Sequence, residues 1–191
     1  MGIRTKLFRN FYPKEYKKSS YWLNYERYYE MRYRGILFDV DNTLVPHGAP
    51  ADEQAVALFA RLREIGFKTC LISNNKEERV RPFAEAVGAE YIYNAHKPSR
   101  KSYRKAFEKL GTDKEHTMFV GDQIFTDVYG ANRVKMYTIL VRPIHPKEEI
   151  QIVIKRKLEK IVLFFYREEK REQRRLKREE KRRLKAEQKC Q

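Results

Sequence analysis

Short apolar runs alternate with segments of helical spacing between residues 35 and 142 of this 191-residue chain. The apolar runs are typical of buried strands, and they cover residues 36–38, 67–72, 91–93, 117–120 and 137–141. The helical segments cover residues 52–65, 77–87, 99–110 and 125–134, and three of them precede a glycine at a C-cap position, Gly66, Gly88 or Gly111. This alternation predicts a parallel, Rossmann-like α/β sheet of about five strands with helices on both faces.

Two carboxylates follow the first predicted strand, in the stretch GILFDVDNTLVPHG at residues 35–48. Ligands of parallel sheets bind outside the carboxyl ends of the strands, which is where Asp39 and Asp41 fall. Like charges this close raise each other's pKa unless a cation is present, so the pair indicates a metal ion. A calcium loop is excluded because Leu44 and Pro50 occupy the positions of its glycine and its bidentate glutamate. A merely capped strand end is the alternative.

Three further predicted strands end in polar residues. Each has an ordinary structural alternative: a turn with Asn75 as helix cap, a solvated lysine before proline, and a second turn with a helix cap. The residues after these strands are, in order, Ser73 and Asn74, then Lys97 before Pro98, then Asp122 and Asp127 after Gly121. Taken together, they place a hydroxyl, a lysine and two more acids at the edge that holds the first carboxylate pair.

The order D-x-D-x-T, Ser, Lys-Pro and Gly-Asp-x4-Asp resembles the haloacid dehalogenase superfamily of phosphatases, and the resemblance covers essentially all of residues 35–142. The stretches GILFDVDNTLVPHG, LISNN, HKPS and VGDQIFTDVYGAN more narrowly resemble subfamily IIIA and the YqeG family within it. Phosphoryl transfer needs an in-line nucleophile, neutralised phosphate oxygens and a proton for the leaving group, and these residue types suit that chemistry.

The resemblance assigns roles to the acidic residues. It implies that Asp39 is the nucleophile and forms an aspartyl-phosphate, and that Asp41 protonates the leaving oxygen and then activates water. It also implies that Mg²⁺ is held by the Asp39 side chain, the Asp41 backbone carbonyl and Asp122, a hard site rich in oxygen ligands. The presence of both Asp39 and Asp41 favours hydrolase activity.

The same resemblance assigns the remaining polar residues. Ser73 and the backbone amide of Asn74 would donate to the phosphate, and Lys97 would add a positive charge beside it. Asp127 and Thr43 would support these groups from a second shell, Asp127 through a water or through Lys97.

Spacing between the motifs leaves no room for a large cap domain, which many members of the superfamily carry. Asp39 to Ser73 accommodates one loop, one helix and one strand, and Ser73 to Lys97 a similar unit. An open site suits a large substrate such as a protein, a nucleic acid end or a lipid headgroup. Cover by an oligomeric partner is the alternative.

The net charge of +16 is concentrated at the two ends of the chain. Residues 1–35 carry +6 and residues 155–191 carry +9, whereas residues 36–154 carry only +1. We therefore expect a basic N-terminal extension at 1–34, a phosphatase core at 35–146 and a basic C-terminal helix or tail at 147–191.

Aromatic and basic residues interleave in the N-terminal extension. This pattern is typical of anionic-lipid interfaces and of single-stranded nucleic acid sites, and a segment that packs back on the core is the third interpretation. The aromatic and apolar members are Ile3, Leu7, Phe8, Phe11, Tyr12, Tyr16, Tyr21, Trp22, Leu23, Tyr25, Tyr28 and Tyr29. The basic members are Arg4, Lys6, Arg9, Lys14, Lys17, Lys18, Arg27 and Arg32.

The C-terminal segment predicts a basic amphipathic helix. Its apolar face comprises Ile150, Ile154, Leu158, Ile161, Val162 and Phe165, with Lys155, Arg156, Lys157 and Lys160 beside it. From Arg167 onward charges dominate, so we expect a solvated and partly frayed helix. Nucleic-acid contact by this tail is an alternative that seven glutamates in residues 155–191 weaken.

Several classes of protein are excluded by what the sequence lacks. Two cysteines, Cys70 and Cys190, make no disulfide framework, and no continuous apolar run approaches the roughly 20 residues of a membrane span. A secretory signal is absent, and Lys6 occupies the position where myristoylation requires Ser or Thr. We therefore expect a cytoplasmic protein, peripheral to the membrane if its basic ends bind lipid.

The leading functional hypothesis is a Mg²⁺-dependent phosphatase for a lipid phosphomonoester at an anionic membrane. The resemblance to phosphatidylglycerophosphate phosphatases supplies the identity of that lipid. Two alternatives stand beside it: a phosphatase for nucleic-acid ends or small metabolites, and an RNA- or ribosome-associated protein that keeps the fold for binding.

Overall fold

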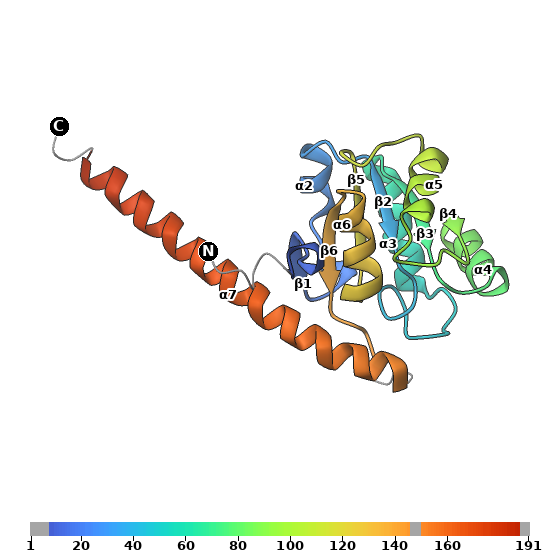
Figure 1. Ribbon diagram of the computed structural model, residues 1–191. Coiled ribbons are helices and arrows are strands. Elements are labelled where there is room, and N and C mark those ends of the chain that lie inside the picture. The colour runs from blue at the N-terminus through green and yellow to red at the C-terminus, as the bar shows by residue number, and fades with distance from the viewer. Residues whose placement is uncertain (1–7, 146–149, 188–191) are drawn as a thin grey trace.

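The chain forms one six-stranded parallel sheet, described here from a computed structural model that covers residues 8–145 and 150–187. Within the last helix, side chains are described for residues 157–185. The strands follow the order β1-β6-β5-β2-β3-β4 across the sheet (Figure 1). Their bounds are β1 Glu15–Lys17, β2 Gly35–Phe38, β3 Lys68–Ile72, β4 Glu90–Ile92, β5 Thr117–Gly121 and β6 Tyr137–Val141. The predicted parallel α/β fold is confirmed, with one strand more than the apolar runs indicated.

Helical segments connect successive parallel strands from β2 to β6. The three glycines predicted as caps end α3, α4 and α5 in the left-handed conformation, with φ values of 104°, 67° and 58°. A π-helical turn, η3, precedes the last short helix of the core. The bounds are α2 Tyr25–Glu30, α3 Glu53–Ile65, α4 Glu77–Val87, α5 Arg100–Leu110, η3 Ile124–Val128, α6 Tyr129–Arg133 and α7 Ile150–Glu187, with the 3₁₀ turns η1 Arg9–Phe11 and η2 Ser20–Trp22.

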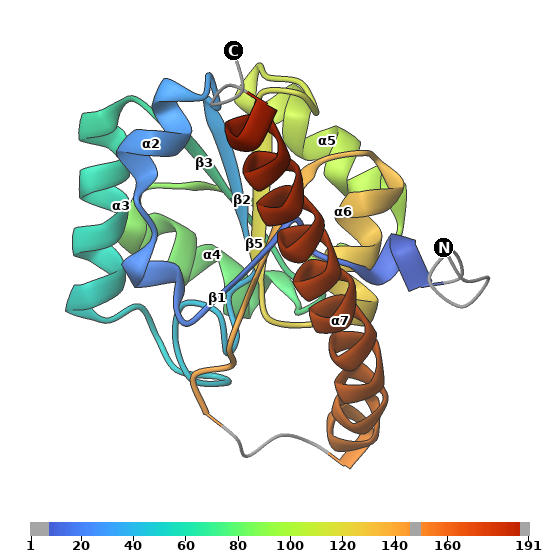
Figure 2. The ribbon, with the colours of Figure 1, turned by 90° about the vertical axis from the view of Figure 1, so that its left-hand side faces the viewer.

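Both faces of the sheet are covered, as the edge-on view of Figure 2 shows. On one face Ile36 and Phe38 of β2 pack with Phe59 of α3 and with side chains of α2 and α4. Leu37 points to the other face and packs with Tyr103 of α5 and residues of α6. The alternation along β2 therefore buries a continuous apolar strand between two helical layers, as expected for a parallel sheet.

The N-terminal segment packs on the core from residue 8, the first residue described. Tyr25 is fully buried, Tyr28 is nearly so, and the hydroxyls of Tyr28 and Tyr137 both donate to Glu15 on β1. β1 itself pairs with β6, the last strand of the sheet. Of the three interpretations of this segment, packing on the core describes these residues. Ile3, Leu7, Arg4 and Lys6 lie outside the described residues.

Two residues of the same segment hold the loop that follows β2. The Ser20 hydroxyl donates to the Thr43 carbonyl at 2.7 Å, and the Tyr21 hydroxyl donates to the Leu44 carbonyl. The next residue, Trp22, remains 67% exposed, with the Lys18 ammonium 4.3 Å from its ring centroid. The N-terminal segment thus combines a structural role with one exposed aromatic residue beside this loop.

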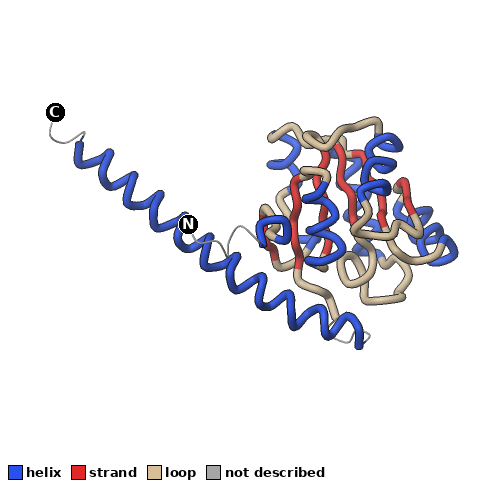
Figure 3. The backbone as a smooth tube through the Cα atoms, in the orientation of Figure 1, coloured by secondary structure: helices blue, strands red, loops and turns tan. Residues whose placement is uncertain are grey.

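Helix α7 contacts the core only through its first half, and its second half projects away (Figures 1 and 3). Val162 and Tyr166 face the core, whereas Leu158 and Ile161 are 52% and 51% exposed. The predicted apolar face is therefore confirmed at Val162 and Phe165 and wrong at Leu158 and Ile161: the buried stripe is centred on residues 159, 162 and 166. Ile150 and Ile154, which belonged to that face, lie outside the described side chains.

The described part of the chain holds no large cap domain: a loop and α3 connect β2 to β3, and α4 connects β3 to β4. Among the helices described, none has a run long and apolar enough to span a bilayer.

Candidate active site

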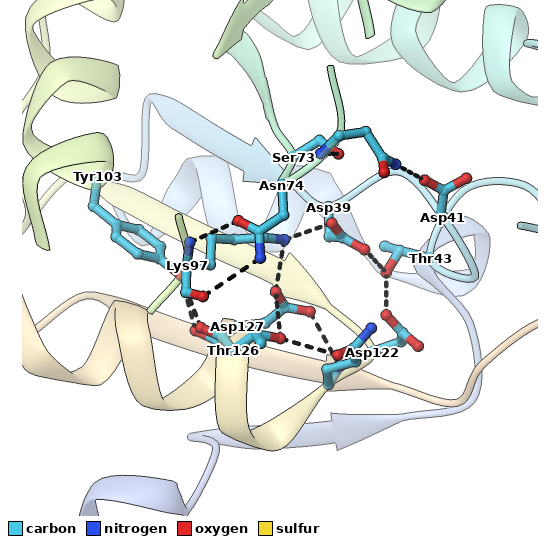
Figure 4. Close-up of polar contacts among 12 residues, drawn as sticks. Asp39, Asp41, Thr43, Ser73, Asn74, Lys97, Tyr103, Asp122, Thr126 and Asp127 are labelled. Carbon is cyan, nitrogen blue, oxygen red and sulfur yellow. Dashed lines mark hydrogen bonds and ion pairs between the residues drawn. The ribbon is translucent and has the colours of Figure 1, made fainter. Parts of the chain in front are cut away.

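The carboxyl ends of β2, β3 and β5 bring the predicted polar residues to one edge of the sheet (Figure 4). Asp39 directly follows β2, and its backbone amide donates to the Val120 carbonyl of β5 at 3.0 Å. Ser73 follows β3 and Asp122 follows β5 in the same way. Because the three strands are adjacent and parallel in register, residues far apart in sequence meet here.

A buried lysine joins two of the acids. The Lys97 ammonium lies 2.5 Å from Asp39 Oδ1 and 2.7 Å from Asp127 Oδ1, and all three side chains are nearly inaccessible to solvent. Charge-assisted hydrogen bonds of this length fix the lysine between its two partners. The alternative of a solvated lysine before proline is therefore wrong.

Burial governs the charges of this pair. It raises the pKa of Asp39 to about 6, although the nearby Lys97 ammonium acts to lower it. Burial also acts to lower the pKa of Lys97, but the carboxylates of Asp127 and Asp39 outweigh it, and the net pKa is raised. Lys97 is thus held in its charged form, whereas Asp39 lacks enough positive charge around it.

A divalent cation would supply the missing charge. Carboxylate oxygens of Asp39, Asp122 and Asp127 lie within 4.8 Å of one another, and the Thr43 hydroxyl is 3.4 Å from Asp39 Oδ2 and 3.2 Å from Asp122 Oδ1. Three buried carboxylates against one ammonium leave an excess of two negative charges among these four groups. All of the carboxylate ligands are hard oxygens, which Mg²⁺ and similar ions prefer. The residues therefore fit a divalent metal.

The glycine before Asp122 makes this arrangement possible. A Cβ added to Gly121 would lie 2.6 Å from Asp127 Oδ2, closer than real Cβ contacts allow. Asp127 is also held by the Gln123 amide, which donates to Oδ2 at 3.1 Å. The missing side chain at Gly121 thus lets the Asp127 carboxylate reach Lys97.

Asp41 lies apart from the buried cluster and has its own partners. Its carboxylate accepts hydrogen bonds from Asn75 Nδ2 at 2.5 Å, from Arg79 at 2.9 Å and from the Gly48 amide at 2.8 Å. In Figure 4 the Asp41 carboxylate points away from Asp39. Sequence reasoning missed Arg79, whose one signal is its position in the first turn of the helix after LISNN. The structural alternative, with Asn75 as a helix cap, is wrong, because Lys76 is the N-cap of α4.

Ser73 and Asn74 follow β3 and form hydrogen bonds with their neighbours at the site. Ser73 is buried, and its hydroxyl accepts a hydrogen bond from the Asn75 amide at 3.2 Å. The Asn74 side chain accepts a hydrogen bond from the Lys97 amide at 2.6 Å and donates to the Lys97 carbonyl at 3.4 Å. Asn74 therefore orients the backbone that carries the buried lysine.

Such an edge suits transfer of a phosphoryl group to a carboxylate, since a lysine and a divalent cation can neutralise phosphate oxygens while an aspartate attacks. The fold and the site together define a phosphotransfer enzyme of the parallel α/β class. The model of the haloacid dehalogenase-like hydrolases matches residues 49–135 of the chain.

Three known proteins illustrate the similarity. Probable phosphatase YqeG of Bacillus subtilis is 36% identical over 154 residues, which cover 80% of this chain and 90% of that protein. Glyceraldehyde 3-phosphate phosphatase of Methanopyrus kandleri is 27% identical over 74% of this chain and 70% of its own length. A crystal structure of 3-deoxy-D-manno-octulosonate 8-phosphate phosphatase from Moraxella catarrhalis, in complex with magnesium, phosphate and the KDO molecule, aligns with a TM-score of 0.42 at 19% identity, over 53% of this chain and 64% of that one. The chain belongs to the haloacid dehalogenase-like hydrolases, and it is a phosphatase that cleaves phosphoric monoesters.

Proposed function

We propose that this phosphatase uses Mg²⁺ and an aspartyl-phosphate on Asp39 to hydrolyse a lipid phosphomonoester, such as phosphatidylglycerophosphate, at an anionic membrane surface. The observation that carries the catalytic part is the buried contact of Lys97 with Asp39 and Asp127 beside Asp122. In this proposal residues 35–146 carry the chemistry, and residues 1–34 and 147–191 flank it. The proposal also places the chain in subfamily IIIA and the YqeG family, and it locates the protein in the cytoplasm.

The reaction begins with attack by Asp39. One carboxylate oxygen forms a bond to phosphorus while the bond from phosphorus to the leaving oxygen breaks, and Asp41 gives a proton to that oxygen. In the second step Asp41 takes a proton from water, whose oxygen attacks phosphorus and releases Asp39 and inorganic phosphate. When substrate binds, Asp41 Oδ2 exchanges its contact with Asn75 for the leaving group, while Oδ1 keeps its contact with Arg79.

The other residues bind and orient. Ser73 and the Asn74 amide donate to the phosphate, and Lys97 holds one Asp39 oxygen while the other attacks. Asp39, Asp122 and the Asp41 carbonyl would hold the metal, which when bound neutralises phosphate oxygens. Asp127 acts through Lys97, and Thr43 acts through the carboxylates of Asp39 and Asp122.

Two surface features support a membrane substrate. Trp22 is largely exposed next to the loop that carries Asp41, and tryptophan is a typical anchor at headgroup depth. A groove of about 500 Å³ between β1 and α7 is lined by cations. They include Lys14, Lys17, Arg167, Lys170, Arg171 and Arg174. Positive charges near an anionic surface each contribute on the order of 1 kcal/mol to binding.

Trp22→Ala tests the membrane part of the proposal. Phosphate release from a phosphomonoester lipid in anionic vesicles should fall several-fold, whereas release from soluble methyl phosphate should stay unchanged, because Trp22 lies outside the buried cluster. Equal losses on both substrates, or no preference for anionic over zwitterionic vesicles, would contradict membrane action. That result would favour the soluble-substrate alternative, which is supported by the similarity to the glyceraldehyde 3-phosphate phosphatase of Methanopyrus kandleri.

The cationic groove also supports the RNA-binding alternative, because the same lysine and arginine side chains can bind the phosphates of an RNA backbone. Tight, salt-dependent RNA binding without any phosphate release would favour it.

A further inference from the structure

A second cavity opens at the catalytic edge, between the end of β6 and the first half of α7. It has a volume of about 490 Å³, within the range of roughly 300–1,000 Å³ that is usual for small-molecule sites. Asp122 forms part of its wall, so the cavity borders the buried acidic cluster. Figure 1 shows the chain leaving β6 and entering α7 near the carboxyl ends of the strands.

The wall that α7 provides is held in place by a buried carboxylate. Glu159 is 5% exposed, and its Oε1 accepts a hydrogen bond of 2.6 Å from the Ile124 amide. Ile124 is two residues beyond Asp122, in the same segment that carries Asp127. Packing of Val162 and Tyr166 against Ile124 and Val128 completes the attachment. Helix α7 is therefore fixed to the segment that carries two of the site's acids.

The lining of the cavity is mainly apolar, with positive charge at its margin. Leu140, Pro143, Leu163 and Phe164 supply the apolar surface. Phe164 is 57% exposed and lies in the same cavity wall as Asp122. Lys160 and Arg167 line the same cavity, one helical turn to either side of Phe164.

We propose that α7 replaces a cap domain: its cavity binds the leaving group of the substrate through the carbon atoms that follow the phosphomonoester and through a second negative charge beyond them. The inference rests on the phosphatase function proposed above, and adds to it the class of leaving group and the residues that select it. Phe164 and Leu163 bind the apolar part, and Lys160 and Arg167 bind the anionic group. A bound leaving group also covers Phe164 and excludes water from Asp122.

The test uses the full-length chain with Mg²⁺ and alkylphosphonates from methyl to octyl, which carry the head of the substrate but resist hydrolysis. Calorimetric affinity should rise about 2- to 4-fold for each CH₂ that enters the cavity, the range expected for partial to full burial of a methylene group. Phe164→Ala should flatten this series. Ile161→Ala is the matched control, since Ile161 is 51% exposed on the same helix but is absent from the cavity lining.

Several results would overturn the inference. Methyl- and octylphosphonate could bind equally to the wild type, or not at all, or Ile161→Ala could flatten the series as much as Phe164→Ala. For the charged part, 6-phosphonohexanoate should bind more tightly to the wild type than to Lys160→Gln, and equal affinities would remove Lys160 from the site.

A separate measurement keeps the two proposals distinguishable. Phosphate release from methyl phosphate by the wild type tests the catalytic function without using the cavity. If release is absent but affinity still rises with chain length, the proposed function fails and the cavity remains a binding site. If release occurs and the chain length has no effect, only the cavity inference fails.

Discussion

Charged residues gather in two regions of this protein, and their surroundings differ completely. At the catalytic edge, four buried groups, Asp39, Asp122, Asp127 and Lys97, contact or face one another. On the second half of α7, residues 171–185 include nine basic and three acidic residues, and every position there is exposed. A single charge matters greatly where water is excluded and little where water surrounds it. The four buried residues should therefore contribute more to stability and catalysis than the exposed charges of α7.

The largest effect on activity is expected from Asp39→Asn, in the buried group. The amide keeps the volume and most hydrogen bonds of the carboxylate but loses the nucleophilic oxygen, so phosphate release should fall on the order of 10³-fold or more. Steady-state assay with methyl phosphate measures the loss, and circular dichroism checks that the fold is kept. Activity close to the wild type would show that another group attacks phosphorus.

Metal removal tests whether the excess negative charge is functional. Chelation with EDTA should abolish turnover, and added Mg²⁺ should restore it, because a divalent cation balances the excess of carboxylates over ammonium among Asp39, Asp122, Asp127 and Lys97. The melting temperature should also rise on adding Mg²⁺, and this rise should disappear in Asp122→Asn. Full activity in chelated protein would disprove the metal site.

Lys97→Met measures the energy of the buried network. The substitution leaves Asp39 and Asp127 without their shared cation, and breaking a buried pair in this way costs about 3–5 kcal/mol of unfolding free energy. Urea denaturation measures the change. Lys101→Met, at an exposed position in α5, is the control and should change stability by less than roughly 0.5 kcal/mol. Similar values for the two variants would refute the contrast between buried and exposed charge.

Arg79→Met tests a partly buried ion pair between these extremes. Arg79 holds the Asp41 carboxylate at 2.9 Å, so its loss should misplace the proposed acid and lower kcat on the order of 10-fold with little change in KM. Arg81→Met removes an exposed arginine of the same helix, 3.8 Å from Glu85, and should have no effect on kcat. A fall in activity through KM alone would show that Arg79 binds substrate and does not position Asp41.

The smallest effect should come from α7. Replacing Arg171, Arg175 and Arg178 together by Gln should change the unfolding free energy by no more than roughly 0.5 kcal/mol and leave turnover of methyl phosphate unchanged. Binding to anionic vesicles should weaken and lose part of its salt dependence. A large loss of stability would mean that the second half of α7 packs against the core in solution.

The sequence predicted which polar residues lie together at the carboxyl ends of the strands, because its signals are local. The apolar runs end at Phe38, Ile72 and Val120. Because the strands are parallel, the residues that follow them meet at the same edge of the sheet. The glycines at 66, 88 and 111 likewise end their helices as expected, because only the residue after the helix must adopt a positive φ.

What could not be predicted depends on contacts between distant segments. β1 has only three residues and no apolar run, and its pairing with β6 joins positions more than 120 apart. Glu159 lies on the face of α7 that is buried, and it is a charged residue that accepts a hydrogen bond from the backbone amide of Ile124. Periodicity alone placed Leu158 and Ile161 on the same face as the buried Val162, because it cannot detect such a partner.

The position of β1 also has a consequence for how the chain acquires its structure during synthesis. The N-terminal segment leaves the ribosome first, yet its partner strand, Tyr137–Val141, is made last in the core. Ser20 and Tyr21 reach the loop after β2 from this same segment. Contacts of such high sequence separation form late in folding because closing the intervening chain costs entropy. The contacts of Ser20 and Tyr21 span only 23 positions, but β1 can pair only once β6 has been made. A nascent chain that ends before β6 therefore has the proposed catalytic residues but lacks this strand pairing for its N-terminal segment.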